Sequence, residues 1–309
     1  MRALLVLAFA LLSVDQAWAQ APIGVRAQGL AGAFVGVADD ATAIYWNPSG
    51  LATGAFISFV ADYSRLEPKY EAPIRPQTTL FTGFSAPPVG VAYYRMPAYA
   101  VATSEAAVAG SGGREDVGRS VRTLATSTVA VSLLQSVGEY VVVGSTVKLV
   151  HGEFGEVGDT KGDLDLSVMS AIGKGRVGLV VRNISTPSFS LDAAGSEAVE
   201  LQRQARFGFG WGSGWPGKSQ VNVAFDADLL RRATPLGDRR DIAGGVETWW
   251  YGGRLGIRGG ARRSTVGDAR EVFAGGVSAG LMAGMFVEGH VARGSRDEQS
   301  WSVGIRMAF

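Results

Sequence analysis

The segment Gly276 to Gly280 reads GVSAG and matches the G-x-S-x-G pattern that surrounds the nucleophilic serine of many hydrolases. That chemistry needs the serine on a sharp turn between a strand and a helix, with an acid and then a histidine later in the chain. Here the motif lies inside a predicted strand, and only Glu288 precedes His290 as a candidate acid. We therefore expect no catalytic serine.

Other recognisable chemistry is also missing from the sequence. The chain has two histidines, His151 and His290, and no cysteine, so no cluster of metal ligands can be recognised. Glycine-rich loops of the nucleotide-binding types do not occur, and the net charge of +1 gives no reason to expect a nucleic-acid partner. We expect a protein that is not an enzyme and that carries no metal and no cofactor.

The charged residues that remain share one face of their predicted strands. In the segment 254–264 three arginines alternate with Leu255 and Ile257, and three charges on one face cannot lie in hydrocarbon at low cost. We expect these charges inside a barrel, where they either pair with one another for structural reasons or line a pore and order a plug. The predicted lumen lining is Arg206, Asp226, Asp228, Glu247, Arg254, Arg258, Arg262, Glu288 and Arg306.

The elements that would position these side chains are strands. Alternating apolar and polar residues, bounded by turn residues, predict fourteen strands and almost no helix. They span residues 54–64, 78–86, 88–97, 120–135, 139–151, 161–172, 175–185, 199–211, 218–230, 239–250, 254–264, 270–282, 285–295 and 299–309.

The connections between these strands alternate in length. Longer loops are expected at residues 65–77, 98–119, 152–160, 186–198 and 231–238, and short turns separate them; only the short last loop, 296–298, breaks the rule. Outer-membrane barrels combine short turns on the periplasmic side with longer extracellular loops. The pattern therefore predicts an all-β, up-and-down transmembrane barrel with antiparallel strands.

The last predicted strand shows which surface meets lipid. Trp301, Val303, Ile305, Met307 and Phe309 share one face, and Ser302, Gly304, Arg306 and Ala308 share the other. Aromatic residues near strand ends are typical of the membrane interface. A water-soluble β-sandwich would instead bury the apolar face in a core. The aromatic residues that we expect at the interface are Trp211, Trp249, Trp250, Tyr251 and Trp301.

The N-terminus resembles a secretory leader. Arg2 precedes an apolar run of about ten residues and the small-x-small ending at Ala17 to Ala19, and such a run is too short for a spanning helix of about 20 residues. We expect residues 1–19 to be a signal peptide, residues 20–50 to form an N-terminal segment, and residues 51–309 to form the barrel. Without cysteine, the exported chain forms no disulfides.

Two regions resemble a known family. Gly24 to Leu51 resembles the N-terminal signature of the FadL-type outer-membrane transport superfamily, particularly its shorter PorV/PorQ-like members. Within it, the sequence Asn47-Pro48-Ser49 has a serine where the family usually has the alanine of Asn-Pro-Ala. The terminal Phe309, with Trp301, resembles the signal read by the barrel-assembly machinery. The resemblance implies a hatch inside the lumen, and turn residues before a barrel are the alternative. The residues implied for the hatch or gate are Gly29, Gly32, Phe34, Asp39, Asp40, Asn47 and Pro48.

The resemblance also implies a location and a function. It implies a barrel in the lipid bilayer of the cell outer membrane that takes up small hydrophobic molecules passively. The alternative is a PorV/PorQ-like barrel that is structural or belongs to a secretion system and binds protein partners through its loops. An open polar porin is a third hypothesis, which a hatch disfavours.

Overall fold

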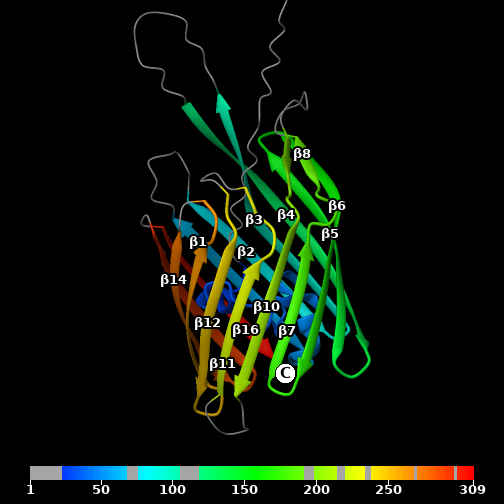
Figure 1. Ribbon diagram of the computed structural model, residues 1–309, viewed down its shortest axis with the longest axis vertical. Coiled ribbons are helices and arrows are strands. Elements are labelled where there is room, and N and C mark those ends of the chain that lie inside the picture. Colours follow the sequence, from blue (N-terminus) through cyan, green and yellow to red (C-terminus); the bar gives the residue numbers. More distant parts are fainter. Residues whose placement is uncertain are drawn as a thin grey trace, which may run out of the picture.

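The chain forms a closed antiparallel barrel of fourteen strands around a short N-terminal segment (Figure 1). This computed structural model describes residues 23–67, 76–104, 118–190, 198–213, 220–233, 238–267, 270–295 and 298–309. The predicted signal peptide lies outside these residues. The predicted fold class and the predicted number of barrel strands are confirmed.

The barrel strands follow one another around the wall in chain order. They are β1 (Ser58–Glu67), β2 (Gln77–Ala86), β3 (Val89–Ser104), β4 (Gly118–Val137), β5 (Val141–Phe154), β6 (Val157–Ile172), β7 (Gly175–Arg182), β10 (Gln204–Ser213), β11 (Gln220–Asp228), β12 (Asp241–Trp250), β13 (Leu255–Ser264), β14 (Glu271–Met282), β15 (Met285–Gly294) and β16 (Gln299–Ala308).

Pairing of the first strand with the last closes the barrel. The register of β1 and β16 runs from Ser58 opposite Ala308 to Glu67 opposite Gln299. Closure leaves neither strand as a free edge, and a free edge would offer unpaired backbone groups to other chains. We call the end of the barrel that holds the short turns at residues 87–88, 138–140 and 173–174 the turn end, and the opposite end the loop end.

The loop end differs from the prediction at three places. The predicted loop at residues 98–119 is too long, because β3 continues to Ser104 and β4 begins at Gly118. The predicted loop at residues 152–160 is wrong, because β5 continues to Phe154 and β6 begins at Val157, with Gly155 at a φ of 59° in the tight turn between them. Between β7 and β10 the chain forms an unpredicted hairpin, β8 (Ser188–Ser190) and β9 (Ala198–Glu200). Phe189 of this hairpin packs with Leu124 and Val150, which lie on the inner face of the wall.

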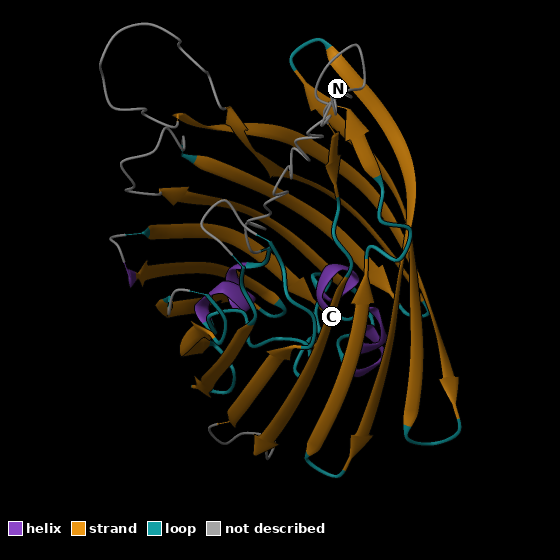
Figure 2. Ribbon diagram, turned by 45° about the horizontal axis from the view of Figure 1, so that its top comes forward, coloured by secondary structure: helices purple, strands orange, loops and turns teal. Residues whose placement is uncertain are grey.

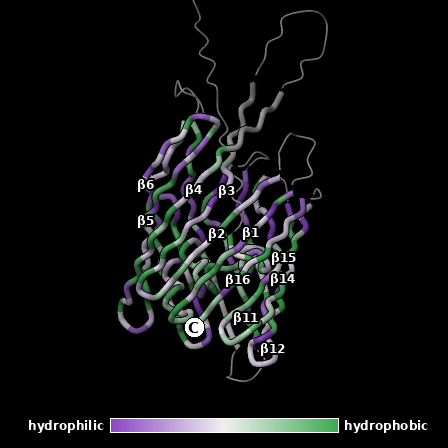
Figure 3. Tube along the Cα trace, turned by 180° about the vertical axis from the view of Figure 1, so that it is seen from behind, coloured by the Kyte–Doolittle hydropathy of each residue, from purple (hydrophilic) through white to green (hydrophobic). Residues whose placement is uncertain are grey.

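Side chains alternate between lumen and outer surface as predicted. Along β2, Thr79 and Phe81 are buried whereas Leu80 and Phe84 are about half exposed on the outside, and polar and apolar residues alternate in the same way along other strands (Figure 3). Lipid would cover these exposed apolar side chains. Trp249 is an exception to the predicted interface set, because an odd-numbered residue of β12 faces inward; it is 9% exposed.

The N-terminal segment lies inside the barrel. Residues 23–53, which we call the hatch, contain α1 (Val25–Gly29), α2 (Ala43–Trp46) and the 3-10 helix η1 (Pro48–Thr53), and Figure 2 shows these helices within the ring of strands. Apolar hatch residues such as Phe34, Ile44 and Leu51 are almost fully buried and pack with inward residues of the wall. The main apolar core is therefore the packing of the hatch against the wall.

Among the described residues, no helix is long and apolar enough to cross a membrane.

Close backbone contact brings the hatch against β10. A Cβ atom added at Gly36 would lie 2.4 Å from the carbonyl carbon of Phe209, and one added at Gly208 would lie 2.5 Å from the backbone nitrogen of Gly36. Only glycine permits such an approach. The glycines of β10 therefore set how closely the hatch meets this wall.

We predict that Gly208→Val displaces the hatch and leaves the barrel closed. Limited proteolysis of the folded protein should then cut within residues 23–53 faster than in the unchanged chain, while heat-modifiable migration on a denaturing gel still reports a folded barrel. Gly244→Val is the matched control, because its Cβ would point outward and meet only Ala224 O, at 3.9 Å. Equal cleavage in both variants would contradict this role of Gly208.

Candidate functional site: the hatch and its ion pairs

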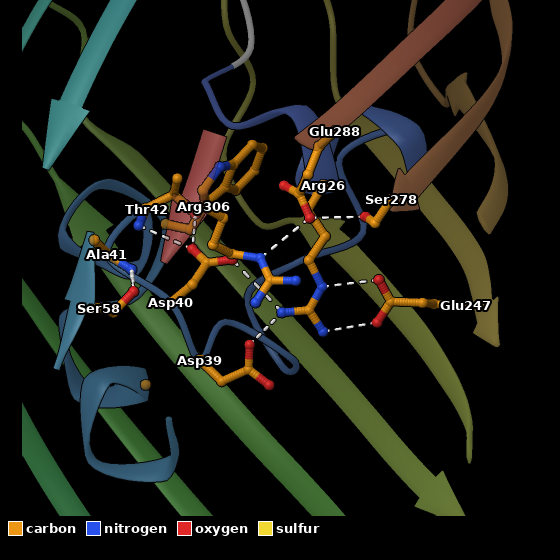
Figure 4. A network of polar contacts seen from close by, with 12 residues as sticks. Arg26, Asp39, Asp40, Ala41, Thr42, Ser58, Glu247, Ser278, Glu288 and Arg306 are labelled. Atoms are coloured by element: carbon orange, nitrogen blue, oxygen red, sulfur yellow. Dashed lines mark hydrogen bonds and ion pairs between the residues drawn. The ribbon is translucent and has the colours of Figure 1, made fainter. Parts of the chain in front are cut away.

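Arg26 of α1 is the main charged contact between hatch and wall. Its Nε and Nη2 atoms donate to the two carboxylate oxygens of Glu247 on β12, at 2.8 and 2.7 Å (Figure 4). Arg26 also forms ion pairs with Asp39 and, at 3.5 Å, with Asp40, which both belong to the hatch. A two-pronged arginine–carboxylate pair fixes direction as well as distance, so Arg26 orients α1 against β12.

Burial and charge act in opposite directions on these hatch groups. Burial disfavours the charged guanidinium of Arg26, but Asp39, Glu247 and Asp40 outweigh it and raise the pKa of Arg26 well above its usual value. Burial raises the pKa of Asp40, and the charge of Arg26 offsets only part of that rise. Arg26 is therefore a permanent cation that needs its carboxylate partners.

A second contact joins the hatch to β10 and β11. Asp226 Oδ2 accepts hydrogen bonds from the backbone N–H groups of Phe34 and Val35, at 3.0 and 2.9 Å, and from Arg206 Nε at 3.0 Å. Arg206 also donates to Asp228 Oδ1 at 2.8 Å and to the carbonyl oxygen of Gly32 at 2.9 Å. The two wall residues thus satisfy backbone groups of a hatch turn that is not helical.

The wall charges form a network of their own beside Arg26. Glu288 of β15 accepts from Arg306 Nε at 3.1 Å and from Ser278 Oγ at 2.7 Å. Arg258 lies 3.7 Å from Glu288 and 3.6 Å from Glu247. Because Arg258 stands between the two glutamates, it connects this network to the partner of Arg26.

The remaining predicted hatch residues help to shape its turns. Asn47 Nδ2 donates to the carbonyl oxygen of Val35 at 2.9 Å, and Pro48 begins η1. Gly32 has a φ of 86°, which favours glycine, and Gly29 leaves room for Arg258. The structure thus brings together all seven predicted hatch residues within the lumen, where only Asp39, with a side chain 26% exposed, is not buried.

Aromatic rings line the opposite side of the hatch. Tyr45 contacts Trp46 and Tyr94 edge to face, with ring centroids 5.6 and 5.7 Å apart, and Tyr94 stacks on Phe81 of β2. Arg182 lies over the Tyr45 ring at 4.3 Å. Such edge and stacked contacts add to the apolar area buried, so the hatch meets β2 and β3 mainly through apolar surface.

The predicted lumen lining needs one correction. Arg254 is exposed in the turn before β13, because the backbone N–H groups of Gly253 and Arg254 both bond to the carbonyl oxygen of Trp250 and the strand begins at Leu255. Trp301 and Phe309 are exposed on the outside, at 39% and 63%. The role of these two residues as an assembly signal stays a prediction.

Sequence reasoning missed a buried cluster on β5 and β6. Lys148 Nζ lies 2.7 Å from Asp163 and 2.6 Å from Asp165 and donates to Asn183 Oδ1 at 2.9 Å. The sequence does contain a pattern that could have revealed this cluster, because Asp163 and Asp165 are two residues apart on one predicted strand and so share a face. In the structure Lys148 of β5 is opposite Asp163. At the loop end, Arg232 and Arg239 join Arg262 around Asp241. Arg232 and Arg239 lie at the two ends of the predicted loop 231–238, and the sequence pattern does not predict that they pair across it.

The residues considered for catalysis have structural contacts. Ser278 lies within β14 rather than at a strand-to-helix turn, and its hydroxyl donates to Glu288. His290 Nδ1 and Ser302 Oγ share a hydrogen bond of 2.7 Å across neighbouring strands. In the described part of the chain, no group of three or more potential ligands is arranged for a metal ion.

Comparisons with solved structures identify relatives of this fold. CymD, a monoaromatic hydrocarbon channel, superimposes with a TM-score of 0.64 at 13% identity and covers 98% of this chain and 99% of its own. A FadL homologue from Pseudomonas aeruginosa superimposes with a TM-score of 0.61 at 9% identity, and the match covers 95% of this chain and 100% of the homologue. The Ralstonia pickettii toluene transporter TbuX superimposes with a TM-score of 0.58 at 11% identity, and the match covers 91% of this chain and 98% of TbuX.

These similarities confirm the predicted FadL-type resemblance at the level of fold. No family model and no curated protein matches the sequence. Of these structures, CymD is named as a channel and TbuX as a transporter. The PorV/PorQ-like part of the resemblance stays a prediction.

We predict that Asp226→Asn loosens the hatch. Removing one partner of a buried charge network costs about 3–5 kcal/mol, and here the loss falls on contacts to Phe34 and Val35. Since the chain has no cysteine, Ala33→Cys supplies a single reporter in the buried hatch. Maleimide should label this cysteine at least about tenfold faster after Asp226→Asn, through more frequent local opening.

Asp159→Asn is the control for this substitution. Asp159 and Lys161 form an exposed ion pair, with side chains 46% and 44% exposed, and exposed pairs contribute little. Labelling of the reporter should therefore stay unchanged. A similar rate in the Asp226 and Asp159 variants would show that the Asp226 contacts do not hold the hatch.

Proposed function

We propose that this chain, which has the fold of FadL-type outer-membrane transporters, is a passive channel for small hydrophobic molecules and that its hatch is the gate. The similar structures include a monoaromatic hydrocarbon channel and a toluene transporter, and both cover nearly all of this chain. The apolar outer surface of the wall suits a bilayer. The cell outer membrane is accordingly the proposed location.

The observation that carries the proposal is a hatch that lies inside the lumen and is held there by specific contacts. Its buried residues pack with the inner faces of several strands. Arg26 binds Glu247 on β12, and Asp226 on the neighbouring strand β11 binds the backbone of the hatch. An open aqueous porin needs a continuous wet path instead. A channel with this hatch conducts only when the segment rearranges, so permeation and hatch position are coupled.

The composition of the hatch also suits apolar cargo. Phe34, Tyr45 and Trp46 form a continuous aromatic surface with Tyr94 and Phe81 of the wall. When the hatch shifts, these rings present apolar area to a molecule crossing the lumen. An apolar solute can replace ring contacts that the hatch loses, whereas an ion cannot.

Membrane insertion would involve two further partners. The lipid bilayer would cover the outward apolar residues, and the barrel-assembly machinery would read the C-terminal strand that ends at Phe309. The alternative of a secretion-associated barrel that binds proteins is left as a sequence-based hypothesis, since no contact among the described residues favours it.

We predict that locking the hatch stops uptake. Ser49 Oγ of η1 lies 2.8 Å from Ser167 Oγ of β6, so Ser49→Cys combined with Ser167→Cys places two thiols close enough for a disulfide in a chain that has no other cysteine. Cells that express the oxidised variant should take up radiolabelled toluene at least about fivefold more slowly than cells with the unchanged chain. Reduction should restore uptake.

Two controls make this result specific. The single Ser167→Cys variant should respond to neither oxidant nor reductant. Deletion of residues 24–45 should instead raise permeation in liposomes. Unchanged toluene uptake with a fully formed disulfide, or a deletion that alters permeation of no apolar solute, would contradict the hatch as gate.

A further inference from the structure

A cavity of about 500 Å³ lies between the hatch and the wall at the turn end. Arg26 and Asp40 of the hatch line it on one side, and Trp249, Phe286 and Arg306 line it from β12, β15 and β16. Glycines of the turns at 252–253 and 284 also line it. Its volume falls within the range of about 300–1,000 Å³ that is usual for small-molecule sites.

Two aromatic rings give this cavity a surface for a planar guest. The rings of Trp249 and Phe286 meet edge to face, with centroids 5.5 Å apart. The guanidinium of Arg306 lies 4.3 Å from the Phe286 centroid and 5.5 Å from that of Trp249. Rings prefer to pack on such edges and faces, and the wall of this cavity thus favours an aromatic ligand over an aliphatic one.

Arg306 also carries a buried donor without an acceptor. Its side chain is 9% exposed and its Nε donates to Glu288, but Nη2 is buried and makes no hydrogen bond. Buried polar groups normally have partners. Arg306 lines the cavity, but Nη2 itself is not exposed to it, so the guanidinium must turn toward a ligand before Nη2 donates to an acceptor oxygen there.

The charges around the cavity argue against an ionic ligand. Arg26 and Arg306 are balanced by Asp39 and Asp40 among the lining residues, and Arg306 is already paired with Glu288. An anion that approached Arg306 would also approach these carboxylates, and a cation would meet two arginines. A neutral acceptor such as a carbonyl oxygen avoids both costs.

We propose that this cavity binds a small neutral aromatic molecule that carries one hydrogen-bond-accepting oxygen. The aromatic ring packs against Trp249 and Phe286, and the oxygen accepts from Arg306 Nη2. If the barrel is a channel as proposed, this cavity at the turn end would be the last binding site for a molecule that leaves the lumen. That role rests on the proposed function, whereas the binding itself does not.

Equilibrium binding to the full-length protein in lipid nanodiscs tests this proposal by fluorine NMR. The probes are para-fluoroacetophenone, para-fluorotoluene, which lacks the acceptor, and para-fluorobenzoate, which is an anion. We expect saturable binding of the ketone with a Kd at least about tenfold lower than that of either other probe. Trp249→Leu should weaken ketone binding at least about tenfold, and Arg306→Lys should remove the preference for ketone over hydrocarbon.

The controls separate binding from folding and from partition into lipid. Trp211→Leu changes a tryptophan that is 41% exposed on the outer surface and should leave the ketone Kd unchanged. Heat-modifiable gel migration identifies any variant that fails to fold, and Phe286→Leu then serves as the second test of the aromatic wall.

Three results would overturn the proposal. Equal affinity for ketone and hydrocarbon would remove the role of Arg306, tighter binding of the benzoate would indicate an anion site, and no saturable binding would show that the cavity is not a site. Because no gradient or transport step is involved, each of these results leaves a hatch-gated uptake of toluene intact. Loss of toluene uptake would likewise leave ketone binding intact.

Discussion

Pairing of charges inside the barrel is the constraint on which the rest of the structure depends. Charged residues facing the lumen avoid hydrocarbon, but the hatch also shields them from water, so each needs a partner. Arg26 meets this need from the hatch side through Glu247, Asp39 and Asp40. Without the hatch Glu247 would lose its two hydrogen bonds from Arg26, and without the wall the hatch could not bury Arg26.

This mutual dependence explains why the backbone of the hatch can be irregular. Only short helices occur among residues 23–53, so many backbone groups lack helical partners. Asp226, Arg206 and Asn47 supply side-chain partners for several of them. Glycines on both sides then permit the close approach that these hydrogen bonds require.

Much of the wall could be predicted from the sequence because a strand has a period of two. The facing of Arg258, Asp226 and Glu288 follows from this period alone. Which arginine meets which carboxylate does not follow, because Glu247 pairs with Arg26 only once the hatch position is known. Arg254 shows the other limit. The turn between β12 and β13 is one residue longer than predicted, and Arg254 therefore lies in the turn rather than in the lumen.

The two sides of the hatch respond differently to water. Toward β2 and β3 it is held by aromatic contacts, which water strengthens, and toward β12 it is held by ion pairs, which water weakens. The cavity at the turn end is lined by Arg26, Asp39 and Asp40, so water in it would contact the ion-pair side of the hatch. For the proposed movement of the hatch, we therefore expect α1 to leave the β12 wall while α2 keeps its contact with Tyr94.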